Sequence, residues 1–139
     1  MNTRNTKQKE IILHTIQSMD THPTILEIYD AVCKVDASIG QATVYRNVSK
    51  LVEEGMVCRI PTNDGQDHYD GNCRRHYHFF CKQCHQLFDL YDGEVFMLIE
   101  KMKKNHQFQI NDIHILCEGI CTNCESCNSP LLENNNYKE

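Results

Sequence analysis

Apolar residues recur at helical spacing in three stretches of the first half of the chain, and each stretch predicts an amphipathic helix. The first covers residues 6–18, where the apolar positions are Ile11, Ile12 and Ile16. The second runs from residue 24 to about residue 34, with apolar positions at 25, 28, 29 and 32. The third covers residues 41–54, and one face of it carries Val44, Val48, Leu51 and Val52.

Local signals mark the ends of the second and third helices. Thr24 and Glu27 have the spacing of a capping box, in which each side chain accepts a hydrogen bond from the other residue's backbone N–H. Gly40 stands at the N-cap of the third helix, and Gly55 stands where a glycine often ends a helix. These signals separate three short helices.

A β-hairpin is predicted after the third helix. Residues 56–60 are rich in β-formers, Asn63-Asp64-Gly65 is a turn signal, and residues 67–70 can return as a second strand. Three helices followed by a hairpin make a winged helix, whose third helix enters the major groove of DNA. The polar side of that helix would offer Gln41, Thr43, Tyr45, Arg46, Asn47 and Lys50 to bases and phosphates. A small helical bundle with solvated polar faces remains the alternative.

The pattern changes beyond residue 75. Residues 76–80 and 86–90 predict strands, residues 93–104 predict a helix, and residues 108–110 and 113–117 predict two further strands. We therefore expect an α+β chain, with a winged-helix DNA-binding domain at 1–70, a hinge at 71–75 and a small α/β domain at 76–127. Residues 128–139 show no periodicity and are expected to be disordered.

Composition and charge narrow the class of protein. Two small domains within 139 residues would each lack apolar area, so metal binding or dimerisation must contribute to stability. The net charge of -5 opposes nucleic-acid binding, but residues 1–60 carry equal numbers of acidic and basic side chains. No apolar stretch approaches the length of a membrane span and the chain does not open on a signal-peptide pattern, so a cytoplasmic protein without a membrane partner is expected.

Cysteine spacing predicts a zinc site. In a reducing compartment the nine cysteines favour metal ligation over disulfides. Four of them form two Cys-x-x-Cys pairs, each able to direct two thiolates at one ion: Cys81, Cys84, Cys121 and Cys124. Two such knuckles complete a tetrahedral shell of four sulfurs, which selects zinc. The shell is closed, so the predicted site is structural and not catalytic.

Two other functional classes share part of this motif. Cys81 to His85 also fits the Cys-x-x-Cys-His signature of covalent haem attachment, and either pair alone could be a dithiol redox motif. Haem attachment requires export and leaves the second pair unexplained. A thioredoxin-like pair opens a helix, whereas strand-like sequence follows Cys84. Both therefore rank below zinc.

Histidines and carboxylates provide a second candidate site. His76 and His78 would point to the same face of a strand, about 7 Å apart, which is close enough to chelate one ion. His22, Asp70 and Asp89 could join them, although each aspartate alone is more often an ordinary turn or strand-end residue. A shell of nitrogen and oxygen without thiolate favours iron(II), manganese(II) or another exchangeable ion. Because such ligands come from both halves of the chain, their ion could fix the orientation of the domains, as in a sensor.

The remaining cysteines include Cys73, beside Arg74 and Arg75. Neighbouring cations are expected to lower its pKa and make it a reactive thiolate. A thiol contribution to sensing therefore stays open. Cys33 and Cys117 lie in apolar settings and are expected to be core residues.

Several motifs together resemble the Fur family of ferric uptake regulators, and most closely its peroxide-sensing PerR branch. They are His22-Pro23-Thr24, the segment from Ala42 to Asn47, His76-Tyr77-His78 before Cys81, and the two knuckles in order. The resemblance covers nearly the whole chain. An additional N-terminal helix of many relatives is missing, so DNA affinity is expected to be distributed differently.

The resemblance implies a homodimeric transcriptional repressor, and not an enzyme, that binds double-stranded operator DNA while its regulatory site holds metal. It implies that the domain at 76–127 pairs with its copy and that the four knuckle cysteines bind structural Zn2+. It assigns Fe2+ or Mn2+ to His22, Asp70, His76, His78 and Asp89. In that branch peroxide reacts with bound iron(II) and oxidises ligand histidines, here His22 and His76. A regulator of iron, zinc or manganese availability on the same scaffold is the alternative.

Overall fold

The computed structural model describes residues 3–74, 76–111 and 113–127, and the chain divides into two compact units, Met1–Arg75 and His76–Glu139. The tail expected to be disordered, 128–139, lies outside the described residues. Among the described residues, no helix is both long enough and apolar enough to cross a bilayer.

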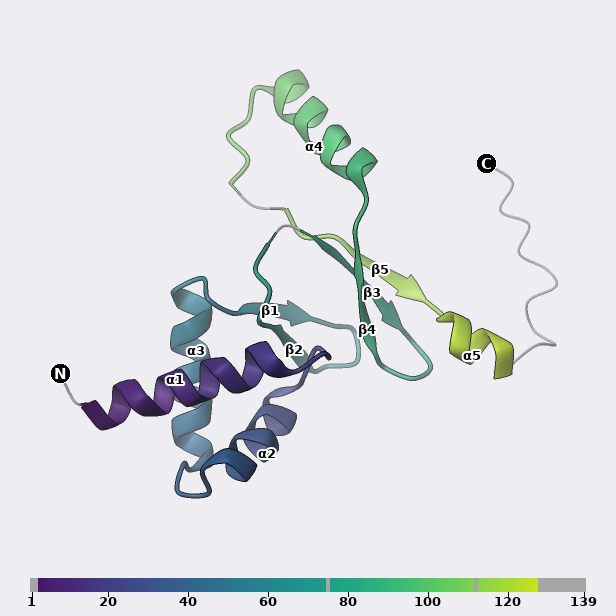
Figure 1. Cartoon of the computed structure of the whole chain (residues 1–139). Coiled ribbons are helices and arrows are strands. Elements are labelled where there is room, and N and C mark those ends of the chain that lie inside the picture. The colour runs from purple at the N-terminus through teal and green to yellow at the C-terminus, as the bar shows by residue number, and fades with distance from the viewer. Residues whose placement is uncertain (1–2, 75, 112, 128–139) are drawn as a thin grey trace. The chain divides into compact units, whose positions relative to one another are not determined.

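The N-terminal unit contains three helices and a hairpin, as the apolar pattern predicts (Figure 1). The helices are α1 (Thr3–Ser18), α2 (Ile25–Val35) and α3 (Gln41–Glu53). The wing is formed by β1 (Cys58–Pro61) and β2 (Asp67–Asp70), which pair antiparallel. The core comprises Ile12, Ile16, Ile28, Val32, Ile39, Val44, Val48, Leu51 and Val57. Burial of this contiguous apolar cluster is what joins the three helices.

The predicted ends of α2 and α3 are confirmed. Thr24 N–H donates to Glu27 Oε2 over 2.7 Å, and Glu27 N–H donates to Thr24 Oγ1 over 3.4 Å, which completes the capping box. Gly40 is the N-cap of α3, and Gly55 follows its C-cap with φ of 73°. A left-handed φ favours glycine, so Gly55 can turn the chain from α3 towards the wing.

The C-terminal unit contains a three-stranded sheet and two helices (Figure 1). Its strands are β3 (Tyr77–Cys81), β4 (Leu87–Leu90) and β5 (Leu116–Gly119), in the order β4-β3-β5. β4 is antiparallel to β3, whereas β5 is parallel to it. Helix α4 (Gly93–His106) connects β4 to β5 along the chain, and α5 (Thr122–Cys127) follows β5.

Two predictions in the C-terminal unit need correction. The strand predicted at 108–110 is wrong, because these residues are irregular and Phe108 is 70% exposed. The strand predicted at 113–117 begins later, at Leu116, where pairing with β3 starts opposite His78. A short run of apolar residues predicts a strand even when it lies in a loop, because the sequence does not show whether another strand pairs with it.

Candidate metal centres

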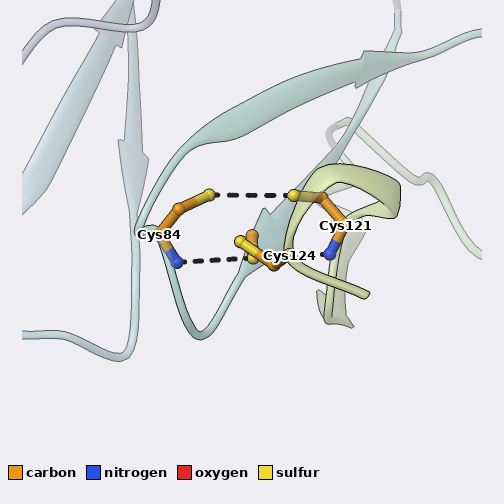
Figure 2. Close-up of side chains that lie close together, drawn as sticks. Cys84, Cys121 and Cys124 are labelled. Atoms are coloured by element: carbon orange, nitrogen blue, oxygen red, sulfur yellow. Dashed lines mark hydrogen bonds between the residues drawn. The ribbon is translucent and has the colours of Figure 1, made fainter. Parts of the chain in front are cut away.

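The four knuckle cysteines converge within the C-terminal unit. Each offers a sulfur that lies within 4.8 Å of the other three, and Figure 2 shows Cys84, Cys121 and Cys124 pointing at one another. In a tetrahedral site with Zn–S bonds of about 2.3 Å, ligand sulfurs lie about 3.8 Å apart. The Cys84 and Cys121 sulfurs are 3.8 Å apart. The donor set and its spacing therefore fit zinc.

Backbone structure holds the two knuckles together. The first knuckle is a tight turn after β3, in which His85 N–H donates to the Cys81 carbonyl over 2.9 Å and His85 has φ of 60°. The second knuckle opens α5, where Glu125 N–H donates to the Cys121 carbonyl over 2.8 Å. Lys82 N–H donates to the Gly119 carbonyl over 2.8 Å and joins the two segments. The parallel pairing of β3 with β5 thus delivers both knuckles to one end of the sheet.

Interactions inside this cluster shift the pKa values of its thiols. Burial raises the pKa of Cys81, but N–H groups of Cys84, Cys121 and Gln83 donate to its sulfur and together lower that pKa to about 6. Desolvation and the neighbouring thiols raise the pKa of Cys124 to about 12. A bare cluster therefore resists full ionisation, whereas a divalent cation would stabilise four thiolates.

A histidine and a carboxylate meet in the N-terminal unit. His22 Nε2 lies 3.4 Å from Asp70 Oδ2, and both side chains are largely buried. His22 precedes α2 and Asp70 ends β2, so the pair depends on contacts between distant segments. Tyr69 N–H donates to the Pro23 carbonyl over 2.9 Å, and this hydrogen bond holds the segment before α2 against β2.

His68 supports this pair from the same strand. Its Nδ1 lies 2.8 Å from the His22 carbonyl oxygen, and its backbone forms an antiparallel bridge with Thr24. His68 is buried, and its Nε2 lies 3.9 Å from Asp64 Oδ2. An imidazole whose Nδ1–H donates to that carbonyl would fix the backbone of His22. Sequence reasoning gave His68 no such role, because this hydrogen bond spans 46 residues.

Two histidines and a carboxylate meet in the C-terminal unit. His78 and Asp89 are directly paired across the β3–β4 ladder. Asp89 Oδ1 lies 3.1 Å from His76 Nε2 and 3.5 Å from His78 Nε2. The His76 and His78 rings are 4.5 Å apart between centroids. His76 lies just before β3, and with His78 and Asp89 it forms a triad of two imidazoles and one carboxylate, the donor types found in non-haem iron(II) sites.

Tyr91 is an additional neighbour of this triad. Its ring stacks on His76, with centroids 5.5 Å apart and planes inclined by 25°. Tyr91 lies just after β4 and is 67% exposed. The sequence gave no signal for this contact, because it depends on how the chain leaves β4.

Most predicted DNA-contacting residues lie on the exposed side of α3. Gln41, Tyr45, Arg46 and Lys50 are exposed, and Gln41 Nε2 donates to the Tyr45 hydroxyl over 3.0 Å. Thr43 is partly buried. Asn47 is only 6% exposed, and its Nδ2 donates to the Thr43 carbonyl over 2.8 Å. We therefore remove Asn47 from the predicted DNA-contacting set, because its side chain lies on the core-facing side of the helix.

The predicted reactive thiolate at Cys73 is corrected by the structure. Desolvation, a hydrogen bond with the Cys58 thiol and the negative charges of Cys58 and Asp70 raise the pKa of Cys73 to about 12. The pKa of Cys73 is therefore raised where the sequence predicted a lowered one, and Arg75 lies outside the described residues. Cys117, expected in a core, is exposed, and Cys33 is half-buried.

A chain that combines a winged helix, a zinc-type cysteine cluster and histidine-carboxylate groups has the features of a metal-responsive, DNA-binding transcription regulator. The chain belongs to the ferric uptake regulator family, whose model matches residues 1–118. The peroxide-responsive repressor PerR of Staphylococcus saprophyticus is 28% identical over 122 residues, which cover 88% of this chain and 82% of that protein.

Solved structures agree with this family. The peroxide stress regulator of Campylobacter jejuni has a TM-score of 0.78 and 28% identity, and the match covers 87% of this chain and 91% of that one. A zinc-bound manganese uptake regulator has a TM-score of 0.64 and 25% identity, with coverage of 86% and 94%. The α+β fold, with a winged helix followed by a small zinc-type domain, is therefore confirmed.

Proposed function

We propose that this protein is a metal-dependent repressor that senses hydrogen peroxide through a regulatory metal ion. The observation that carries the proposal is the ligand chemistry of its two units. The N-terminal unit pairs His22 with Asp70, and the C-terminal unit groups His76 and His78 around Asp89. Each group contains nitrogen and oxygen donors without thiolate, which suits iron(II) or manganese(II) better than the cysteine cluster does.

The two groups are complementary as ligand sets. The C-terminal triad would supply two nitrogen donors and one carboxylate to an ion, and sites of this composition leave further ligand positions open. His22 and Asp70 would fill open positions and so connect the N-terminal unit to the same ion. An ion held by residues 1–70 and 76–127 through the hinge at 71–75 would favour one arrangement of the domains. That arrangement would be the one competent to bind DNA.

DNA binding is assigned to α3 and the wing of each protomer in a homodimer acting in the cytoplasm. Gln41, Tyr45, Arg46 and Lys50 on the exposed side of α3 would contact double-stranded operator DNA, with Thr43 at its edge. The domain at 76–127 would provide the dimer contact. Helix α4 supports this assignment, because Met97, Leu98 and Met102 are exposed on it.

Peroxide would act on the ligands of the regulatory ion. Bound iron(II) supplies the one-electron chemistry that activates hydrogen peroxide, whereas manganese(II) does little of it. His22 or His76 would take up one oxygen atom on the imidazole ring. An oxidised imidazole is a poorer ligand, so these residues would release the ion and the arrangement that binds DNA would lose its support.

A duplex-binding experiment tests this function. The manganese-loaded protein is first used to select a binding duplex from a random-sequence library. Binding of that duplex is then measured for the iron and manganese forms before and after hydrogen peroxide. With metal kept in large excess over the protein, so that a modest loss of metal affinity does not empty the site, we expect only the iron form to release the duplex. Equal retention by both forms would contradict peroxide sensing while leaving metal-dependent binding intact.

The alternative is a regulator of metal availability. Similarity to a zinc-bound manganese uptake regulator favours it, because that protein shares the fold at 25% identity. Such a regulator would bind the duplex in proportion to free metal and would keep its histidines unmodified after peroxide. The same experiment therefore separates the two functions.

A further inference from the structure

Cys58 and Cys73 form a thiol pair in the N-terminal unit that no role above uses. Cys58 is the first residue of β1 and Cys73 follows the end of β2, so the wing hairpin separates them in sequence. The two thiols share a hydrogen bond. Neither belongs to the zinc knuckles or to the histidine-carboxylate groups.

The backbone explains why these thiols meet. Cys58 is paired with Asp70 across the β1–β2 ladder. Beyond Asp70 the chain curls, because Asn72 N–H donates to Asp70 Oδ1 over 2.8 Å and Arg74 N–H donates to Asn72 Oδ1 over 3.1 Å. Two consecutive turns of this kind bring residue 73 back towards the start of β1. Cys58 is half-buried whereas Cys73 is exposed, so small oxidants can reach the pair from solvent.

We propose that Cys58 and Cys73 form a reversible intramolecular disulfide when the protein meets hydrogen peroxide. The Cys58 thiol loses its proton and its sulfur attacks a peroxide oxygen, so that an S–O bond forms, the O–O bond breaks and water leaves. The second thiol attacks the resulting sulfenic acid, so that the S–S bond forms, the S–O bond breaks and a second water leaves. The two sulfurs lose two electrons and peroxide gains them. Exchange with low-molecular-weight thiols would restore the pair.

The disulfide would act on Asp70. Asp70 accepts the N–H of Asn72 through Oδ1 and lies next to His22 through Oδ2, so its carboxylate connects the turn to the ligand pair. A covalent bond between β1 and residue 73 would reshape that turn, since disulfide geometry restricts the separation of the two backbones. We expect weaker metal binding at Asp70 in the oxidised protein. This consequence rests on the proposed function, whereas formation of the disulfide does not.

Peptide mapping tests the disulfide directly. Zinc-loaded protein without iron or manganese is treated with hydrogen peroxide, its free thiols are alkylated before unfolding, and it is digested with trypsin. Cys58 and Cys73 lie alone in peptides 51–59 and 60–74. We expect these peptides to be linked, with a combined mass lower by two hydrogen atoms, in a chain that runs as a monomer on a non-reducing gel. Absence of the linked pair would overturn the proposal.

Variants separate this pair from other thiols and from the proposed function. Cys58→Ser and Cys73→Ser are each expected to abolish the linked peptide, whereas Cys33→Ser, at a half-buried cysteine of the same unit, keeps it. Manganese(II) affinity is then compared in the oxidised parent and the oxidised Cys73→Ser variant. We expect manganese(II) affinity to fall about tenfold in the oxidised parent only. A loss of this size is typical when a residue that supports a metal ligand is disturbed. Equal affinities would overturn the coupling to Asp70.

Discussion

Asp89 Oδ1 lies between two imidazoles, 3.1 Å from His76 Nε2 and 3.5 Å from His78 Nε2. The register of β3 and β4 fixes this arrangement, because His78 and Asp89 are directly paired. A carboxylate held in this way is placed to share an ion with both histidines.

Replacement of Asp89 tests that arrangement. Asp89→Ala removes the only carboxylate of the proposed triad, so we expect manganese(II) affinity, measured by calorimetry, to fall by more than about tenfold. Glu100→Ala is the control, because Glu100 is an exposed carboxylate of α4 in the same unit. Unchanged affinity in a folded Asp89→Ala protein would remove Asp89 from the ligand set.

Tyr91 is expected to position His76. Tyr91→Ala removes the ring that stacks on the imidazole, and we expect manganese(II) affinity to fall by up to about tenfold while zinc content stays unchanged. Tyr91→Phe keeps the ring and should restore affinity. If the phenylalanine variant binds as weakly as the alanine variant, stacking is not the cause.

Loss of one zinc ligand should unfold the C-terminal unit. Cys84→Ser removes one of four converging sulfurs, so we expect zinc per chain, measured by elemental analysis, to fall sharply. Structural zinc contributes about 10 kcal/mol or more to folding in small zinc peptides, so thermal unfolding of this unit should move well below that of the parent. Cys117→Ser, an exposed cysteine outside the knuckles, should retain zinc. Full zinc content in Cys84→Ser would contradict the four-sulfur site.

Substitutions on the exposed side of α3 should weaken duplex binding, whereas substitutions on its buried side should lower stability. Arg46→Ala removes an exposed cation, and we expect duplex affinity to fall by about 1–3 kcal/mol with no change in unfolding temperature. Asn47→Ala removes the hydrogen bond to the Thr43 carbonyl and should lower stability. Lys104→Ala on α4 is the charge control for Arg46. Equal duplex binding by Arg46→Ala and Lys104→Ala would contradict the assigned DNA surface.

The N-terminal unit could be predicted because its signals are local. The capping box at Thr24 and the glycine at residue 55 define helix ends within a few residues, and the apolar spacing of α2 and α3 defines their buried sides. The zinc cluster could also be predicted from the sequence, because the spacing within each Cys-x-x-Cys pair is typical of two ligands of one zinc ion.

Features that depend on distant segments could not be predicted. The position of β5 depends on its pairing with β3, and α5 follows from the bend of the second knuckle. The raised pKa of Cys73 comes from desolvation and from Cys58, which lies fifteen positions earlier in the chain. The contact between Tyr91 and His76 likewise requires the β3–β4 pairing first.

The central claim is that peroxide oxidises the histidine ligands of an iron-loaded regulatory site. The most direct measurement is the mass of tryptic peptides 10–34 and 76–82, which contain His22 and His76, after peroxide treatment, with fragmentation to place any added oxygen. We predict one additional oxygen atom on His22 or His76 in the iron form and none in the manganese form. Unmodified His22 and His76 in the iron form, or equal oxidation of both forms, would contradict the claim.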